Sequence, residues 1–235
     1  MKTIILAAGK STRLMPLTKD LPKCLLKING KSIINYQIDA LLDNKVEKIA
    51  VVVGFNSSKI IQHLKENYPE VNFTFIENKE FDTTSASYSL WLAKKYMEDE
   101  FLYLNSDLFC HPEIIKNVIE HNEPNITAIQ KIHWNEEAVN VTLDKNGLIA
   151  DIGKHIKETS SHGEFIGITK INKNFTEKLI SSLEKLIDNG DKKRYAVDAI
   201  NAAIKLGGKI YALDVTHLPA IEIDTLEDYE NAKNL

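Results

Sequence analysis

Hydrophobic and polar residues alternate between two patterns along the first half of the chain. Short apolar runs such as Thr3–Ala8 are typical of strands buried on both faces. Between the runs, apolar residues recur at helical spacing, as they do behind Ser32, a candidate helix cap. The predicted strands are Thr3–Ala8, Lys48–Gly54, Val71–Ile76 and Phe101–Leu104, and the predicted helices begin near Ser32, Ile60, Ser87 and Pro112. Strands that alternate with helices predict an α/β fold, with a mostly parallel sheet flanked by helices.

The second half of the chain has a different pattern. Val139–Leu143 and Leu148–Ile152 flank the turn sequence Asp144–Gly147, which predicts an antiparallel hairpin. A strand over Phe165–Ile171 is followed by helical spacing near 176–187 and 196–205, and then by a strand over Ile210–Val215. The last helix begins at Thr225, where Thr225 and Asp228 have the spacing of a capping box.

We found no repeat, low-complexity tract or linker that would divide the 235 residues into independent domains. We therefore expect a single domain over residues 1–235. Within it, residues 1–130 form a Rossmann-like core, residues 131–220 a small, partly antiparallel annex, and residues 221–235 a closing segment.

The net charge of −4 argues against a dedicated nucleic-acid-binding protein, which needs a basic face to displace counterions. Cys24 and Cys110 are too few for a disulfide framework and fit a reduced compartment. The apolar run at the N-terminus is too short for a secretory signal, and no segment has the roughly 20 apolar residues of a membrane span. We therefore expect a cytoplasmic protein that binds neither nucleic acid nor membrane.

The loop after the first predicted strand carries the first candidate chemistry. It contains Gly9, Ser11, Thr12 and Arg13, and Lys23 follows shortly after. Glycine allows close approach of a ligand, and N–H groups, hydroxyls and cations can bind phosphate oxygens. The alternative is a basic surface turn. The loop lacks the second glycine of a P-loop and the three glycines of a dinucleotide fingerprint, which excludes a P-loop kinase.

Four segments, taken together, resemble the sugar-phosphate nucleotidyltransferase family. They are Leu6-Ala-Ala-Gly-Lys-Ser-Thr-Arg-Leu14 with Pro22-Lys23, Asn105-Ser106-Asp107, Gly163-Glu-Phe-Ile-Gly167, and Ala220-Ile-Glu-Ile-Asp-Thr225 with Asp228. The first segment is the most specific of the four, and together they span nearly the whole chain. The resemblance implies transfer of a nucleoside monophosphate onto a phosphate group, with release of pyrophosphate.

The resemblance also implies roles for individual residues. Asp107 and Asp224 would hold Mg²⁺, and Arg13 and Lys23 would act with them as catalytic residues on the phosphates. The alternative for each aspartate is a helix cap. The implied nucleotide-binding residues are Leu6, Ala7, Ala8, Gly9, Ser11, Thr12, Arg13, Lys23, Thr84, Ser85, Ser89 and Ser106. Such a site agrees with the chemistry, because an acceptor phosphate is already anionic and the transfer mainly needs positioning and charge stabilisation.

The segment from Asn78 to Leu90 resembles the cytidylyltransferase branch, which includes the phosphocholine enzymes. This branch commonly has asparagine near the position of Thr84-Ser85, so the chain departs from its pattern there. We favour CTP as the nucleotide. The alternatives are a sugar-1-phosphate uridylyl-, thymidylyl- or guanylyltransferase, and a non-catalytic sensor of nucleotides or phosphosugars.

The acceptor is expected to be a phosphorylated small molecule resembling phosphocholine, a phosphonate or a sugar phosphate. Lys154, Glu164, Tyr195 and Asp198 are the candidate acceptor-binding residues. A quaternary ammonium would need aromatic faces, for which Trp91, Trp134 and Tyr195 are candidates. A homodimer is one assembly that we expect the chain to be able to form.

Overall fold

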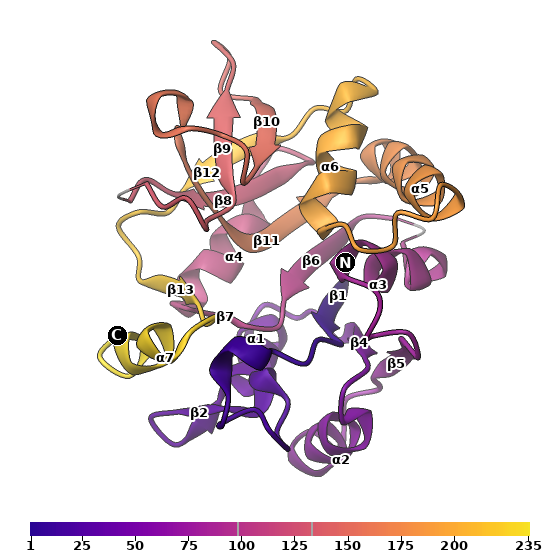
Figure 1. Ribbon diagram of the computed structural model, residues 1–235, viewed down its shortest axis with the longest axis vertical. Coiled ribbons are helices and arrows are strands. Elements are labelled where there is room, and N and C mark those ends of the chain that lie inside the picture. The colour runs from indigo at the N-terminus through magenta and orange to yellow at the C-terminus, as the bar shows by residue number, and fades with distance from the viewer. Residues whose placement is uncertain (98, 133) are drawn as a thin grey trace.

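The computed structural model describes residues 1–97, 99–132 and 134–235. Its centre is a parallel group of four strands: β1 (Lys2–Ala7), β4 (Lys48–Val53), β5 (Thr74–Glu77) and β6 (Phe101–Asn105). These strands lie in the order β6-β1-β4-β5, and Figure 1 shows their arrangement. The parallel group confirms the α/β fold expected from the alternation of strands and helices.

The second half of the chain extends the sheet beyond β6 with antiparallel strands. Strand β11 (Gly163–Ile171) pairs antiparallel with β6, β8 (Ile126–Gln130) and β9 (Asn140–Leu143). Strand β10 (Ile149–Gly153) forms the expected hairpin with β9, and β12 (Tyr211–Asp214) lies parallel to β8. The annex is therefore continuous with the central sheet.

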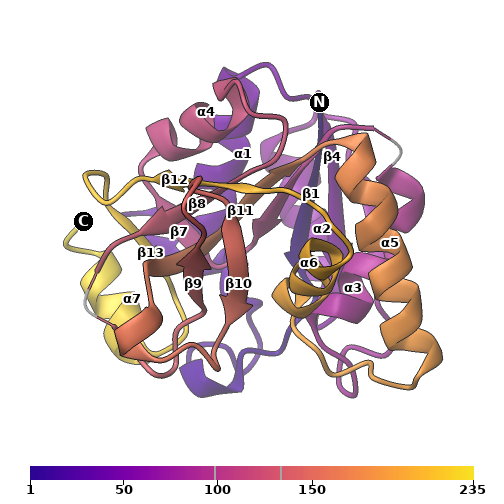
Figure 2. The same cartoon turned by 90° about the horizontal axis from the view of Figure 1, so that it is seen from above.

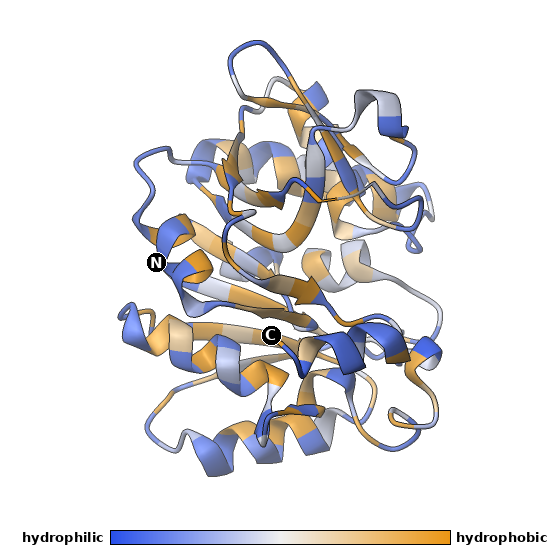
Figure 3. Ribbon diagram, turned by 90° about the vertical axis from the view of Figure 1, so that its left-hand side faces the viewer, coloured by the Kyte–Doolittle hydropathy of each residue, from blue (hydrophilic) through white to orange (hydrophobic). Residues whose placement is uncertain are grey.

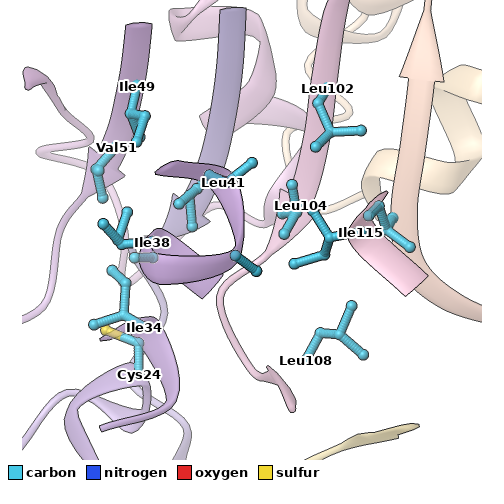
Figure 4. Close-up of a cluster of buried hydrophobic side chains, with 14 of the residues drawn as sticks. Cys24, Ile34, Ile38, Leu41, Ile49, Val51, Leu102, Leu104, Leu108 and Ile115 are labelled. Carbon is cyan, nitrogen blue, oxygen red and sulfur yellow. The ribbon is translucent and has the colours of Figure 1, made fainter. Parts of the chain in front are cut away.

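Helices cover both faces of the sheet (Figure 2). One hydrophobic cluster packs α1 (Ile33–Asp43), α2 (Ser57–Asn67) and α4 (Pro112–Glu120) against one face. Figure 4 shows part of this cluster, where Ile38 and Leu41 of α1 lie near strand residues such as Val51 and Leu104. The opposite cluster packs α3 (Ala86–Leu92), α5 (Lys173–Asp188) and α6 (Ala196–Lys205) against the other face. The strands are buried because both of their faces are covered.

Two short two-stranded sheets lie outside this layer. Strand β7 (Leu108–Cys110) pairs antiparallel with β13 (Ala220–Glu222), and β2 (Lys27–Ile28) pairs with β3 (Lys31–Ser32). The pairing of β7 with β13 brings the C-terminal segment beside the residues that follow β6. Helix α7 (Leu226–Ala232) then begins with the expected capping box between Thr225 and Asp228.

Several local predictions differ from the structure. The strand β5 begins at Thr74 rather than Val71, and Lys23–Leu25 forms the 3₁₀ turn η2. Helix α3 ends at Leu92 and is followed by the 3₁₀ turn η3 (Lys94–Tyr96). Ser32 precedes α1, but its hydroxyl contacts His63 Nε2 at 3.1 Å and makes no helix cap. In each case a tertiary contact or a local turn decided what hydrophobic spacing alone could not.

The remaining 3₁₀ turns are η1 (Thr12–Leu14) and η4 (Glu158–Ser160). Figure 3 shows hydrophobic and hydrophilic residues interspersed along the helices, as expected for elements with one buried face. Within the described residues, no helix is long and apolar enough to cross a membrane.

Candidate active site

A cleft with a volume of about 760 Å³ lies at the carboxyl ends of the parallel strands. Residues that directly follow β1, β5 and β6 line it, which is where open α/β sheets bind their ligands. The C-terminal segment around Asp224 and parts of the annex form its other walls. Of the predicted site residues, the cleft is lined by Leu6, Ala7, Ala8, Gly9, Ser11, Arg13, Lys23, Thr84, Ser85, Ser89, Ser106, Asp107, Lys154, Glu164, Tyr195 and Asp224.

One predicted nucleotide-binding residue, Thr12, and one predicted acceptor-binding residue, Asp198, do not line the cleft. Thr12 begins the turn η1, where its carbonyl accepts a hydrogen bond from Met15 N at 3.2 Å. Asp198 belongs to the capping box of α6, and its carboxylate accepts a hydrogen bond from Tyr195 N at 2.8 Å. The nucleotide-binding role of Thr12 and the acceptor-binding role of Asp198 stay predictions.

The loop after β1 forms one wall of the cleft. Apart from its two chain neighbours, no atom of the described residues lies within 4 Å of the position that a Cβ at Gly9 would take, so the backbone there is open to a ligand. Ser11 has a left-handed conformation (φ 52°), and its carbonyl accepts a hydrogen bond from Thr18 Oγ1 at 2.8 Å. These features hold the loop in a shape that presents polar groups and Arg13 to the cleft.

Lys23 lies between the two aspartates predicted from the sequence. Its Nζ is 2.6 Å from Asp107 Oδ2 and 2.9 Å from Asp224 Oδ1, and its side chain is only 11% exposed. Burial alone would lower the pKa of Lys23, but the two carboxylates raise it well above its usual value. Lys23 is therefore held as a cation in the floor of the cleft.

Arg13 places a second cation beside this pair. Its guanidinium lies 2.9 Å from Asp224 Oδ2. Burial would raise the pKa of Asp224, but Lys23 and then Arg13 lower it below the usual value. Asp224 therefore stays ionised between two cations.

Neither aspartate serves as a helix cap. Helix α4 begins at Pro112 and is capped by His111, so Asp107 lies well before it. Thr225, rather than Asp224, is the cap of α7. The alternative interpretation of the two aspartates as caps is therefore wrong.

Glu222 is a half-buried carboxylate in the cleft whose part in the site was not predicted from the sequence. It accepts a hydrogen bond from Asn105 Nδ2 at 2.6 Å, and the hydroxyl of Tyr103 donates to Asn105 Oδ1. Burial, followed by the nearby charge of Asp107, raises the pKa of Glu222 to about 8. A Cβ at Gly167, whose φ is +80°, would lie 2.5 Å from Glu222 Oε1, so glycine is needed there.

Asn78 organises the loop that carries Thr84, Ser85 and Ser89. Its Nδ2 donates to Thr84 Oγ1 at 3.1 Å and to Ser89 Oγ at 3.0 Å. Its Oδ1 accepts from Glu80 N at 3.0 Å. These contacts could not be predicted from the sequence, where Asn78 is only one position of a motif, because they depend on how the loop folds.

The annex side of the cleft carries a mixture of charges. Lys154 Nζ lies 3.4 Å from Glu137 Oε2 and 5.5 Å from the ring centroid of Tyr195, which is half exposed. Burial, and secondarily the charge of Asp228, raises the pKa of Glu164 to about 7. Trp91 and Trp134 do not line the cleft, and Trp134 Nε1 donates to Ile156 O at 3.3 Å.

The aspartate pair fits a divalent cation that is completed by substrate oxygens. Asp107 Oδ1 is buried and has no hydrogen-bond partner among the described residues, and both carboxylates already contact one ammonium group. No group of three metal-binding side chains occurs in residues 1–97, 99–132 and 134–235. Mg²⁺ is commonly held by one or two carboxylates together with substrate phosphates, which is the donor set available here.

Comparison with known proteins shows the family to which the chain is related. A model of the nucleotidyl transferase family matches residues 2–152. The chain is 32% identical over 205 residues to the bifunctional protein GlmU of Methanococcus maripaludis, covering 81% of the chain and 48% of the relative. It is 28% identical to the CTP:phosphoglutamine cytidylyltransferase of Campylobacter jejuni over 252 residues, covering 98% of each.

The structure is similar to that of the CTP:phosphocholine cytidylyltransferase LicC from Streptococcus pneumoniae. The two share 25% identity with a TM-score of 0.80, over 99% of this chain and 97% of the other. The chain spans about half the length of the GlmU relatives that it matches.

Proposed function

The chain belongs to the nucleotidyl transferase family, and we propose that it transfers CMP from CTP onto a phosphorylated small molecule and releases pyrophosphate. The observation that supports this proposal most strongly is the contact of Lys23 with both Asp107 and Asp224, beside the open loop after β1. A cation from η2 and two carboxylates, one after β6 and one after β13, match the needs of a reaction between polyanions.

In the proposed reaction, an acceptor phosphate oxygen attacks the α-phosphorus of the nucleotide. The new P–O bond forms as the bond between the α-phosphorus and the bridging oxygen of the β-phosphate breaks, and pyrophosphate leaves. The nucleophile is an anion, so no side chain has to remove a proton. The residues of the chain therefore act by binding, by orienting and by offsetting charge.

The individual residues have distinct tasks in this proposal. Lys23, buried and cationic, contacts the α-phosphate, and Arg13 at the cleft edge contacts the departing phosphates. Asp107 and Asp224 would hold Mg²⁺, which when bound neutralises charge on the phosphate oxygens. Backbone groups from Leu6 to Gly9 and the hydroxyl of Ser11 would bind the nucleotide.

The choice of CTP rests on similarity and on the loop that Asn78 organises. LicC and the Campylobacter relative are named as CTP-dependent enzymes. The segment 78–90, which resembles the cytidylyl branch, lines the cleft through Asn78, Thr84, Ser85 and Ser89. The alternatives in the same class are sugar-1-phosphate transferases that use UTP, dTTP or GTP.

We assign the acceptor to the annex side of the cleft, where Lys154, Glu164 and Tyr195 lie. Lys154 suits an acceptor phosphate, and Glu164 suits a hydroxyl or an amine. Among the described residues, the aromatic rings that line the cleft are those of Phe81 and Tyr195. Each already has a lysine ammonium near the ring, at 5.8 Å for Lys10 and 5.5 Å for Lys154. A quaternary ammonium such as that of phosphocholine would have to displace one of these lysines.

The proposal is tested by measuring pyrophosphate release with CTP, UTP, dTTP, GTP and ATP in turn. Each nucleotide is paired with phosphocholine, phosphoethanolamine, aminoethylphosphonate and hexose 1-phosphates, in the presence of Mg²⁺. The proposal predicts turnover with CTP and one acceptor class, and none after chelation of the metal. Turnover with another nucleotide would replace the cytidylyl assignment. Tight nucleotide binding without turnover on any acceptor would favour the alternative of a non-catalytic sensor of nucleotides or phosphosugars.

A further inference from the structure

Gln37 lies outside the cleft but is bound to the segment that carries Asp107. Gln37 is in the middle of α1, is 2% exposed, and does not line the cleft. Its Nε2 donates hydrogen bonds to Asn105 O and Leu108 O, each at 2.8 Å. Because both partners are carbonyl oxygens, the nitrogen of the amide must face them.

These two hydrogen bonds hold the ends of a short segment together. Asn105 is the last residue of β6 and Leu108 the first of β7, so the amide of Gln37 bridges the residues on either side of Ser106 and Asp107. Two backbone contacts hold the segment between these ends. Ser106 N donates to Leu6 O at 3.2 Å, and Ile223 N donates to Asp107 O at 3.1 Å.

The placement of the Asp107 carboxylate depends on this backbone support. Its Oδ2 contacts Lys23, which the proposed reaction engages with the nucleotide. Its Oδ1 has no hydrogen-bond partner among the described residues. The carboxylate therefore has little other than its own main chain to fix its position once Lys23 turns to a phosphate.

Glutamine at position 37 has both a benefit and a cost for stability, because its Nε2 makes two hydrogen bonds while its Oε1 makes none with the described residues. The Oε1 atom of the amide is buried, and within the described part of the chain it has no hydrogen-bond partner, which is unfavourable. A methionine or leucine would fill similar space on α1 without that unpaired oxygen. What it would lack is the pair of donors that face Asn105 O and Leu108 O.

We propose that Gln37 is a positioning residue, which holds the 105–108 segment so that Asp107 is oriented for the divalent cation. The inference rests on the proposed function, since it assumes that Asp107 binds the metal. Groups that orient metal ligands commonly change metal affinity by about tenfold or more when they are removed. The expected signature is therefore a changed metal dependence.

The test compares Gln37→Met with two matched controls. Gln62→Met removes an exposed glutamine of α2 whose Nε2 donates to Glu66 Oε1 at 2.8 Å. Ile38→Ala truncates the next residue of α1, which is fully buried in the core, and lowers stability without removing a hydrogen bond to the 105–108 segment, since the isoleucine side chain makes none. The measurements are the Mg²⁺ concentration for half-maximal turnover, the KM for nucleotide, the Tm, and Mn²⁺ binding by electron paramagnetic resonance with the nucleotide that the wild type uses.

The proposal predicts that Gln37→Met raises the half-saturating Mg²⁺ concentration and the dissociation constant for Mn²⁺ by about tenfold. High Mg²⁺ should restore most of its turnover, and KM for nucleotide at saturating metal should change little. Both controls should keep the metal dependence of the wild type, although Ile38→Ala melts earlier. If Gln37→Met loses Tm as Ile38→Ala does but keeps the wild-type metal dependence, the positioning role is overturned.

A failure of the proposed function would look different. In that case the wild type itself would show no turnover, or Asp107→Asn would bind Mn²⁺ as tightly as the wild type does. A working wild type whose metal binding depends on Asp107 but not on Gln37 overturns only the inference about Gln37.

Discussion

Lys23 and Asp224 lie 201 positions apart in the sequence, yet Lys23 Nζ contacts Asp224 Oδ1 at 2.9 Å in the floor of the cleft. The contact exists because β13 pairs with β7, which follows the Asp107 segment. Lys23 thereby occupies the space between two carboxylates that we assign to a metal ion. The chain thus supplies a cation of its own to the aspartate pair.

Lys23→Met should remove that cation and expose the aspartate pair to added metal. We expect turnover to fall by about a hundredfold or more, because a charge at the reacting phosphate is lost. Asp107 and Asp224 would then repel each other, so Mg²⁺ without nucleotide should raise the Tm of Lys23→Met more than that of the wild type. Differential scanning fluorimetry with and without Mg²⁺ measures this, and equal shifts in both proteins would contradict it.

Asn78→Ala should weaken nucleotide binding. The change leaves Thr84 and Ser89 without the amide that joins them, so the loop loses the shape that faces the nucleotide. We expect the KM for nucleotide to rise about tenfold, equivalent to about 1.4 kcal/mol, with a smaller change in kcat. Asn67→Ala is the matched control, since Asn67 is an exposed asparagine that does not line the cleft and whose Nδ2 donates to His63 O at 2.8 Å. A KM unchanged in Asn78→Ala would refute this role.

Gly167→Ala should damage activity beyond its effect on stability. Gly167 and Gly207 both have positive φ, at +80° and +83°, but only at Gly167 would a Cβ meet Glu222 and Asn105. Either substitution to alanine should cost about 1–3 kcal/mol from backbone strain. Only Gly167→Ala should also lower kcat, because it displaces Glu222 from the cleft floor. Chemical denaturation and steady-state kinetics on both variants separate the two effects, and equal kcat values would count against this account.

The stability of the protein should depend on the ionisation of Glu164. Burial raises the pKa of Glu164 from 4.5 to about 7, so the folded chain binds a proton there that the unfolded chain releases at lower pH. A raised acid pKa means that stability falls as pH rises from about 4.5 through 7. Glu164→Gln should therefore flatten the decline in the free energy of unfolding between pH 5 and pH 8. Parallel pH profiles of the two proteins would show that Glu164 does not contribute.

Most of the fold could be predicted because its signals are local. Buried runs such as Thr3–Ala8 predicted parallel strands, and the Asp144–Gly147 turn predicted the hairpin of β9 and β10. The ends of elements were predicted less well. The strand predicted from Val71 begins only at Thr74, because the amides of Val71 and Phe73 donate to Tyr68 O and Val71 O in local turns instead.

The candidate site was predicted where a motif with charged residues, such as the loop with Gly9 and Arg13, marked it. The groups that support it gave no such signal. Glu222 lies in an ordinary strand pattern, and Gln37 occupies a position in α1 where hydrophobic spacing predicts only burial. Their roles follow from partners that are distant in sequence, such as Asn105 and Leu108, which only the folded chain brings near.

The central claim is that Asp107 and Asp224 form the metal site of a nucleotidyl transfer centre. The most direct test is pyrophosphate release by the wild type, Asp107→Asn and Asp224→Asn, with CTP and its acceptor at saturating Mg²⁺. Asp43→Asn, an exposed change on α1, is the control. We predict that both site variants lose turnover by about a hundredfold to a thousandfold while the control and all melting temperatures stay close to the wild type. Turnover at the wild-type rate in either site variant would contradict the account.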